Sequence, residues 1–177
     1  FSPWTEVEPL VSNTPLLEGA DRLRRSLVPS LLDARRINES LSNPVIELFE
    51  TARIYLPRPG ELPSEQWTLA AVSGQGTLHL KGAVEAAIDA LHIGDPLVVT
   101  DFSNGLLTPG QAAELRLGSD RLAFLGEVAA TALKTLGLRG PAAILEIDLS
   151  VLARHARLAT KYAEHSAFPT IVRDLNL

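Results

Sequence analysis

VIELFETARIYL, residues 45–56, alternates between apolar and polar side chains with a period of two. The apolar parity holds Ile46, Leu48, Ala52, Ile54 and Leu56, and the other parity holds Glu47, Thr51 and Arg53. Successive side chains of a β-strand point to opposite sides of its sheet, so this pattern predicts a strand with one buried face. The stretch is longer than the usual strand of about five or six residues, which indicates a sheet as the framework of the fold.

Glu50 is the exception in this strand, because its parity places it among the apolar residues. A carboxylate on a buried face needs a hydrogen-bond partner, or its neutral form is favoured. Two interpretations stay open. The favoured one is a hydrogen-bonded structural Glu50, and the other is a catalytic or ligand-binding Glu50.

A helix is expected before this strand, over residues 26–41. Ser26 can cap its N-terminus, and Pro29 lies in the first turn, where a missing N–H costs least. The apolar residues fall at helical spacing and predict one apolar stripe: Leu27, Val28, Leu31, Leu32 and Ile37.

Further elements follow along the chain. Strands are predicted over 67–73, 112–118, 121–128 and 142–148, and helices over 80–94, 129–136 and 149–159. The strands on either side of GSD (118–120) form a predicted hairpin, and Gly137 is expected to end the helix before it. Strands joined by short turns with helices placed irregularly between them predict an α+β domain, in which a mainly antiparallel sheet is flanked by helices.

Composition excludes several classes of protein. The chain has 177 residues, a formal net charge of −5 and no cysteine. Its apolar runs, such as PLVVT (96–100), are far shorter than the ~20 residues that a bilayer span needs. The acidic balance argues against a free-standing nucleic-acid binder, and the absence of cysteine excludes disulfides and favours a reducing, cytoplasmic location.

A search for catalytic chemistry returns little. The four histidines lack metal-ligand spacing, and GQG (74–76) lacks the further residues of a dinucleotide loop or a P-loop. Asp101 and Asn104 could form a loop site, although such residues usually serve turns. No catalytic residue and no metal ligand are predicted.

Six segments, read in order, resemble the C-terminal half of the bacterial phenylalanyl-tRNA synthetase beta subunit. The resemblance runs from about residue 11 to the end of the chain, and the segments that carry it are LRRSLVPSLLDARRINES, NPVIELFETARIYLP, LHLKGAVEAAIDALHI, DRLAFLGEV, AAILEIDLSVL and FPTIVRDLNL. It implies the fold of a class II aminoacyl-tRNA synthetase catalytic core that lacks the catalytic motifs.

The resemblance also implies a division of labour. The active centre would belong to the alpha subunit, and ATP and Mg would bind in the full enzyme and not in this fragment. Arg53 lies on the strand most similar to the second class II motif, so Arg53 and Glu50 would mark a vestigial cleft. A ligase activity of the chain itself, using Arg53, Glu50 and residues near Asp101, is the disfavoured hypothesis.

The partners implied by the resemblance are the alpha subunit, in a heterotetramer, and tRNA(Phe), bound mainly through domains absent here. Helix 26–41 resembles the first class II motif, which packs across a subunit boundary. The predicted contact residues are Leu27, Leu31, Arg35 and Asn38, of which Arg35 and Asn38 are expected on the exposed side of the helix. The expected function is therefore a non-catalytic support for the catalytic subunit, and the alternative is a regulatory module that binds a small molecule.

Three regions are expected along the chain. Residues 1–20 read as a lead-in or linker, and residues 21–165 as the synthetase-like core. Residues 166–177 resemble a linker and the first strand of a truncated, ferredoxin-like anticodon-binding domain, so the chain is expected to be a fragment.

Overall fold

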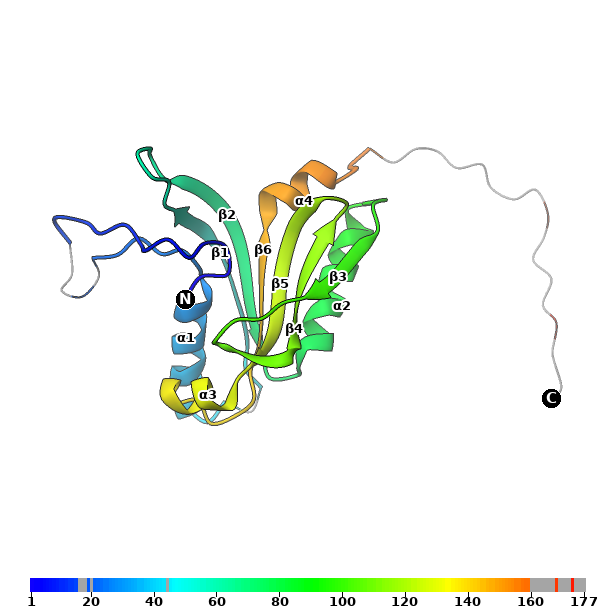
Figure 1. Cartoon of the computed structure of the whole chain (residues 1–177). Coiled ribbons are helices and arrows are strands. Elements are labelled where there is room, and N and C mark those ends of the chain that lie inside the picture. Colours follow the sequence, from blue (N-terminus) through cyan, green and yellow to red (C-terminus); the bar gives the residue numbers. More distant parts are fainter. Residues whose placement is uncertain (16–18, 20, 44, 160–167, 169–172, 174–177) are drawn as a thin grey trace.

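An antiparallel sheet forms the body of the protein (Figure 1). The computed structural model describes residues 1–15, 19, 21–43, 45–159, 168 and 173. Within these residues the sheet has six strands in the order β1-β2-β6-β5-β4-β3, and every neighbouring pair is antiparallel. The strands are β1 (Glu47–Leu56), β2 (Ser64–Ser73), β3 (Leu97–Asp101), β4 (Leu107–Leu117), β5 (Asp120–Val128) and β6 (Ala143–Asp148). The predicted α+β fold class is confirmed.

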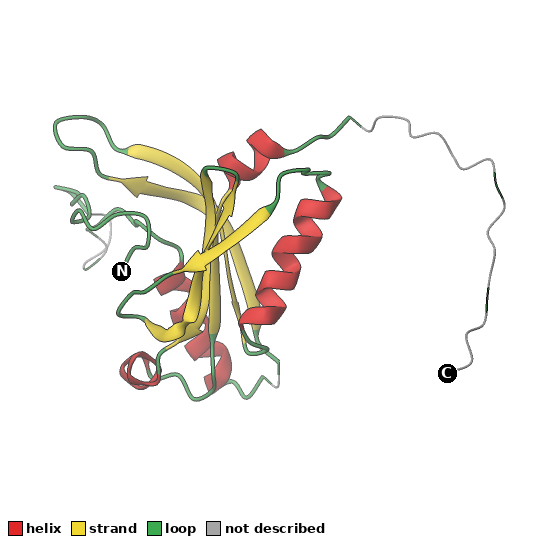
Figure 2. Cartoon of the chain, turned by 45° about the vertical axis from the view of Figure 1, so that its right-hand side comes forward, coloured by secondary structure: helices red, strands yellow, loops and turns green. Residues whose placement is uncertain are grey.

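Four described helices cover the two faces of the sheet (Figure 2). They are α1 (Val28–Ser40), α2 (Thr77–Ala90), α3 (Ala130–Leu136) and α4 (Leu149–His155). Residues of α1 and α3 pack in one apolar cluster with Phe124, and residues of α2 and α4 pack in a second cluster with Leu125 and Leu145. The two layers explain why β5 and β6 read as nearly continuous apolar runs, because both of their faces are buried.

Strand β1 follows the predicted parity. Its even residues are buried or half-buried, and Ile54 is completely buried, whereas Glu47, Phe49, Thr51 and Arg53 are exposed. Pairing with β1 reaches from Glu47↔Ser73 to Leu56↔Ser64, so β2 begins three residues earlier than the predicted 67–73. Backbone pairing, which the side-chain pattern does not reveal, sets this boundary.

Strand β3 was not predicted from the sequence. It lies at the edge of the sheet and pairs with β4 alone. Val98 is 42% exposed and Val99 is 49% exposed, so neither face of the strand is buried and no alternation marks it.

Local turn chemistry ends two elements as expected. Gly118 has φ +57° in the two-residue turn between β4 and β5, where a positive φ suits a tight hairpin. Gly137 has φ +70° and forms the left-handed C-cap of α3. Helix α2 begins differently, because the Glu127 carboxylate of β5 accepts hydrogen bonds from the backbone N–H (2.8 Å) and hydroxyl (2.7 Å) of Thr77.

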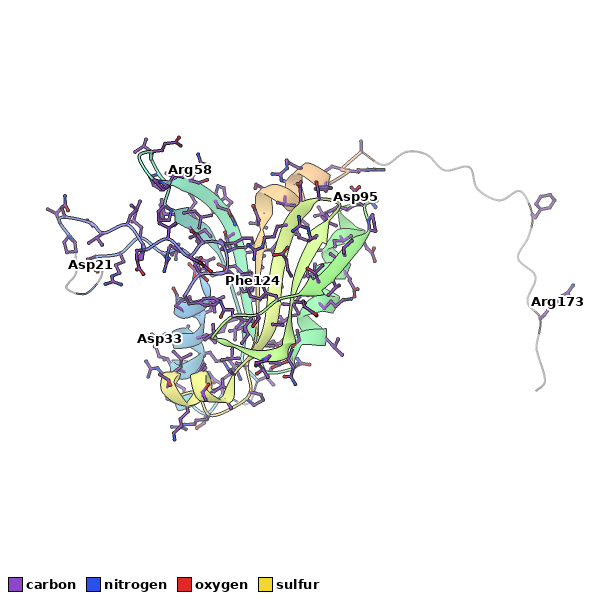
Figure 3. The ribbon with its side chains drawn as sticks, in the orientation of Figure 1. Asp21, Asp33, Arg58, Asp95, Phe124 and Arg173 are labelled. Carbon is purple, nitrogen blue, oxygen red and sulfur yellow. The ribbon has the colours of Figure 1, made fainter. Side chains whose placement is uncertain are left out.

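The first residues of the chain contact the core. The rings of Phe1 and Trp4 meet that of Phe124 edge-on, with centroid distances of 6.2 and 5.7 Å. Figure 3 labels Phe124 in the middle of the sheet. The domain boundary at residue 20 stays a prediction, but these contacts tie the lead-in to the sheet.

No described helix is both long and apolar enough to cross a membrane. The predicted linker and strand over 166–177 lie outside the described residues, apart from Phe168 and Arg173.

Candidate functional site

The predicted apolar stripe of α1 faces the sheet of its own chain, except for Ile37, which is 47% exposed. Leu27 is 0% exposed and Leu31 is 6% exposed, and both belong to the cluster around Phe124. They were predicted as contacts with another subunit, and that role stays a prediction. Within this chain, however, their side chains are already packed.

Arg35 corrects a sequence expectation, because it is buried and not exposed. Its Nε donates to Glu39 Oε1 (3.1 Å), and its two terminal nitrogens donate to the carbonyls of Ile46 (3.2 Å) and Pro141 (2.8 Å). The helical pattern of the sequence placed Arg35 on the exposed side because charged residues are usually exposed. A guanidinium can be buried, however, where acceptors meet its fixed fork of donors.

Asn38 is half-buried at the end of α1. Its Nδ2 donates to the carbonyl of Ala34 (2.9 Å), and its Oδ1 accepts from Nδ2 of Asn43 (2.9 Å). The side chain therefore holds the turn after the helix. Its predicted contact with another subunit stays a prediction.

Four exposed apolar residues lie close to one another in the sequence, before and after this turn. Ile37 is 47% exposed, Leu41 and Val45 are each 69% exposed, and Phe49 is 72% exposed. We call these four residues, which are neighbours along the chain, the α1–β1 surface; Leu48 of β1 packs on the side of α1, and Phe49 lies on the other side, towards α2. A sequence signal for it existed, since Val45 and Phe49 share the solvent-facing parity of Glu47 and Arg53.

Two hollows adjoin the α1–β1 surface. One, of about 460 Å³, is lined by Asn43, Val45 and Ile46 together with the Arg35–Glu39 pair. The other, of about 300 Å³, lies between α2 and the start of β1, where Leu48 and Phe49 contribute to its wall. Exposed apolar residues beside hollows are typical of surfaces that receive another protein.

Glu47 lines both hollows and is held in its charged form. It accepts hydrogen bonds from Ser73 Oγ (2.7 Å) and Gln75 Nε2 (3.0 Å), and His79 Nε2 lies 3.1 Å away. The bond from Ser73, with further help from His79 and Gln75, lowers the pKa of Glu47 below its usual value. Glu47 therefore sets a fixed negative charge between the hollows.

Glu50 and Arg53 do not meet in a common cleft, because they lie on opposite faces of β1. Glu50 accepts a hydrogen bond from Arg24 (2.8 Å), which supplies the partner that its position required. Arg53 pairs with Glu65, and its guanidinium lies 5.2 Å from the ring centroid of Trp67.

These residues do not fit an ATP and magnesium site. The guanidinium of Arg53 is already engaged by a carboxylate and a ring, and the part of the chain that the structure describes has no group of three or more acidic, histidine or cysteine side chains placed to hold a metal. Asn104 serves a turn, since its Oδ1 accepts from the backbone N–H of Leu106 (2.7 Å). No step of a ligase reaction is assigned to these side chains.

Glu146 was missed by sequence reasoning. It is 0% exposed in the middle of β6, where its carboxylate accepts from Ser26 Oγ and from the backbone N–H of Leu27, each at 2.7 Å. Burial raises the pKa of Glu146 to about 7. A single Glu within the apolar run AAILEID was the available signal.

Solved structures with a similar fold are synthetases. The pyrrolysyl-tRNA synthetase of Desulfitobacterium hafniense superposes with a TM-score of 0.62 over 80% of this chain and 55% of that one, at 19% sequence identity. At this identity the likeness shows the fold alone, and it confirms the expected class II synthetase-like architecture.

Sequence comparison is more specific. The chain is 39% identical to the phenylalanine–tRNA ligase beta subunit of Rhodopirellula baltica, over all of this chain and 28% of that protein. It is 28% identical to the same subunit of Clostridium acetobutylicum, over 92% of this chain and 21% of that protein. The chain thus spans less than a third of the length of these relatives.

A family model described as the phenylalanyl tRNA synthetase beta chain CLM domain matches residues 6–149. This match covers the whole described sheet and the helices α1, α2 and α3. The chain belongs to the phenylalanyl-tRNA synthetase beta chain family, as its CLM domain.

Proposed function

We propose that this chain is an assembly module of phenylalanine–tRNA ligase that supports the catalytic alpha subunit and is itself not catalytic. Membership of the beta chain family supports the proposal that the enzyme is phenylalanine–tRNA ligase. The positions of Glu50 and Arg53 on opposite faces of β1 support the absence of a catalytic role.

The observation that carries the proposal is the α1–β1 surface. These four exposed apolar side chains follow one another along the chain from the end of α1 to the start of β1, and Val45 and Phe49 each line one of the two hollows. Glu47 adds a fixed charge that would favour a cationic or hydrogen-bond-donating group on the partner.

The predicted contacts at Leu27, Leu31, Arg35 and Asn38 remain proposals. Asn38 is accessible in part, and Leu27, Leu31 and Arg35 would act indirectly by holding α1 in place. We propose the α1–β1 surface as the direct contact.

Other roles of the whole ligase follow the family. ATP and Mg would act at the alpha subunit, tRNA(Phe) would bind mainly through other domains, and the assembly would work in the cytoplasm as a heterotetramer. The small net negative charge agrees with a minor role of this domain in binding tRNA.

A binding experiment with the purified alpha subunit tests the proposal. Val45→Asp and Phe49→Asp should each weaken binding by about tenfold or more, because each places a charge in an apolar contact. Leu62→Asp is the matched control, since Leu62 is 87% exposed and lies outside the α1–β1 surface. Unchanged affinity in both variants, or no binding by the parent chain, would refute the proposal.

A further inference from the structure

His155 lies between two carboxylates at the end of α4. Its Nδ1 is 3.0 Å from Asp95 Oδ2, and its Nε2 is 3.1 Å from Asp120 Oδ2. Asp95 belongs to the turn between α2 and β3, and Asp120 begins β5. Figure 3 labels Asp95 at the edge of the sheet that α4 approaches. One imidazole therefore joins three elements that are distant in sequence.

The two contacts require two protons on the ring. An ionised carboxylate only accepts hydrogen bonds, whereas a neutral imidazole donates from one nitrogen and accepts at the other. Both contacts are therefore satisfied only by the imidazolium form. In agreement, the hydrogen bond with Asp95, followed by that with Asp120, raises the pKa of His155, and the bond from His155 is the main cause of the lowered pKa of Asp120.

Further charges face this group from the surrounding elements. Arg154, on α4 itself, donates to Asp120 Oδ2 at 3.0 Å. Arg116, on β4, donates to the carbonyl of Ser119, which precedes Asp120. The guanidinium of Arg157 packs over Gly94, the neighbour of Asp95. Of these cations, Arg154 lowers the pKa of Asp120 and so keeps it ionised when the ring loses a proton.

The chain beyond α4 is held at the same place. The backbone N–H of Arg157 donates to the carbonyl of Leu91 at 2.9 Å, just before the turn that carries Asp95. His155 and Arg157 therefore dock the end of α4 on one turn through two separate contacts.

We propose that His155, Asp95 and Asp120 form a proton-dependent clasp that fixes the direction in which the chain leaves the sheet after α4. When the imidazolium loses a proton, one ring nitrogen presents a lone pair to a carboxylate, and that contact opens. The last turn of α4 and the Arg157–Leu91 hydrogen bond are then released together. This inference is independent of the proposed assembly role.

The sign of the pH dependence follows from the two pKa shifts. The pKa of His155 is raised, so its contribution is complete below the unfolded value of about 6.5 and is lost as pH rises through the folded value. The pKa of Asp120 is lowered, so its contribution is complete above the unfolded value of about 3.9 and is lost as pH falls through the folded value. The clasp is closed between these limits and opens as pH rises through the raised pKa of His155.

Nuclear magnetic resonance of the imidazole nitrogens and of the Arg157 amide tests the clasp. We expect both nitrogens of His155 to be protonated at about pH 6.5, with a midpoint above that ordinary histidine value. The protection factor of the Arg157 amide, which is corrected for intrinsic exchange, should fall by about tenfold across the His155 midpoint.

Two substitutions separate the clasp from general stability. Asp95→Asn should lower the His155 midpoint and the Arg157 protection, whereas Asp89→Asn, on the exposed side of α2, should change neither. A His155 midpoint at or below the ordinary value of about 6.5 would overturn the proposal. An Arg157 protection factor that stays constant across the His155 midpoint would also overturn it.

Discussion

The carboxylate of Glu146 accepts a hydrogen bond of 2.7 Å from the backbone N–H of Leu27, which lies 119 positions earlier in the chain. The same carboxylate accepts from Ser26 Oγ, so a central strand holds the N-terminus of α1. Because α1 ends at the α1–β1 surface, this buried contact also places the proposed docking surface relative to the sheet.

Glu146 should make stability depend on pH. Its pKa is raised in the folded state, so its contribution is complete below the unfolded value and is lost as pH rises through about 7. We expect the free energy of unfolding to fall between about pH 5 and pH 8, by up to roughly 3 kcal/mol from this group. Urea unfolding at both pH values measures the change.

Glu146→Gln is the matched variant for that prediction. The amide keeps the shape of the side chain and does not titrate; its oxygen can accept from the N–H of Leu27, and its NH2 can donate to Ser26 Oγ. The parent should therefore lose more stability than the variant between the two pH values. An equal loss in both proteins would show that the Glu146 carboxylate is not the titrating group, since His155 titrates in each.

The Arg35–Glu39 pair should be far more important to stability than the neighbouring Arg36–Asp33 pair. The side chains of the first pair are 6% and 9% exposed, and those of the second are 47% and 61% exposed. Arg35→Met leaves a buried carboxylate without its cation and should cost about 3–5 kcal/mol. Arg36→Met should cost less than about 1 kcal/mol. If chemical denaturation showed similar losses of unfolding free energy in the two variants, the burial of Arg35 would be contradicted.

Gly126 should not tolerate a methyl group. A Cβ at this position would lie 2.8 Å from Ala112 Cβ and 2.9 Å from Leu107 Cδ1. Gly126→Ala should therefore destabilise the protein by about 1–3 kcal/mol. Gly82→Ala is the control, because open space surrounds Gly82 within α2, and it should stabilise by about 0.5–1 kcal/mol. A higher melting temperature for Gly126→Ala than for Gly82→Ala would contradict this packing.

The two tryptophans should differ in their effect on stability. Trp4 packs edge-on against the buried Phe124, whereas Trp67 is 51% exposed on β2. Trp4→Ala should cost about 2–3 kcal/mol, below the value for a fully buried ring because Trp4 is half-buried. Trp67→Ala should cost less than about 1 kcal/mol, chiefly its contact with Arg53. An unaffected Trp4→Ala variant would mean that the lead-in does not stabilise the core.

Local patterns predicted most of the elements, and the exceptions have physical causes. The parity of β1 indicated its buried face and its exposed Glu47, Thr51 and Arg53, because backbone geometry alone alternates the side chains. The edge strand β3 escaped prediction because neither of its faces is buried. The start of β2 escaped because pairing with β1 extends past the apolar residues.

The candidate site was predicted less well. Helical spacing indicated the stripe of α1 but not its target, which is the core of its own chain. The burial of Arg35 depends on the carbonyl of Pro141, 106 positions away, and the partners of His155 lie 60 and 35 positions earlier. No pattern within a window of a few residues contains such partners.

The sequence by itself determined the class of the fold, since the periodicities of its strands and helices and the glycines of its turns follow from backbone geometry at each position. The order of its segments, and their resemblance to those of the phenylalanyl-tRNA synthetase beta subunit, likewise indicated the family. Only the tertiary structure decided which ionisable groups are buried and which apolar side chains remain exposed. A buried charge is stable only where acceptors or donors from distant segments converge on it, and that convergence exists once the chain has folded.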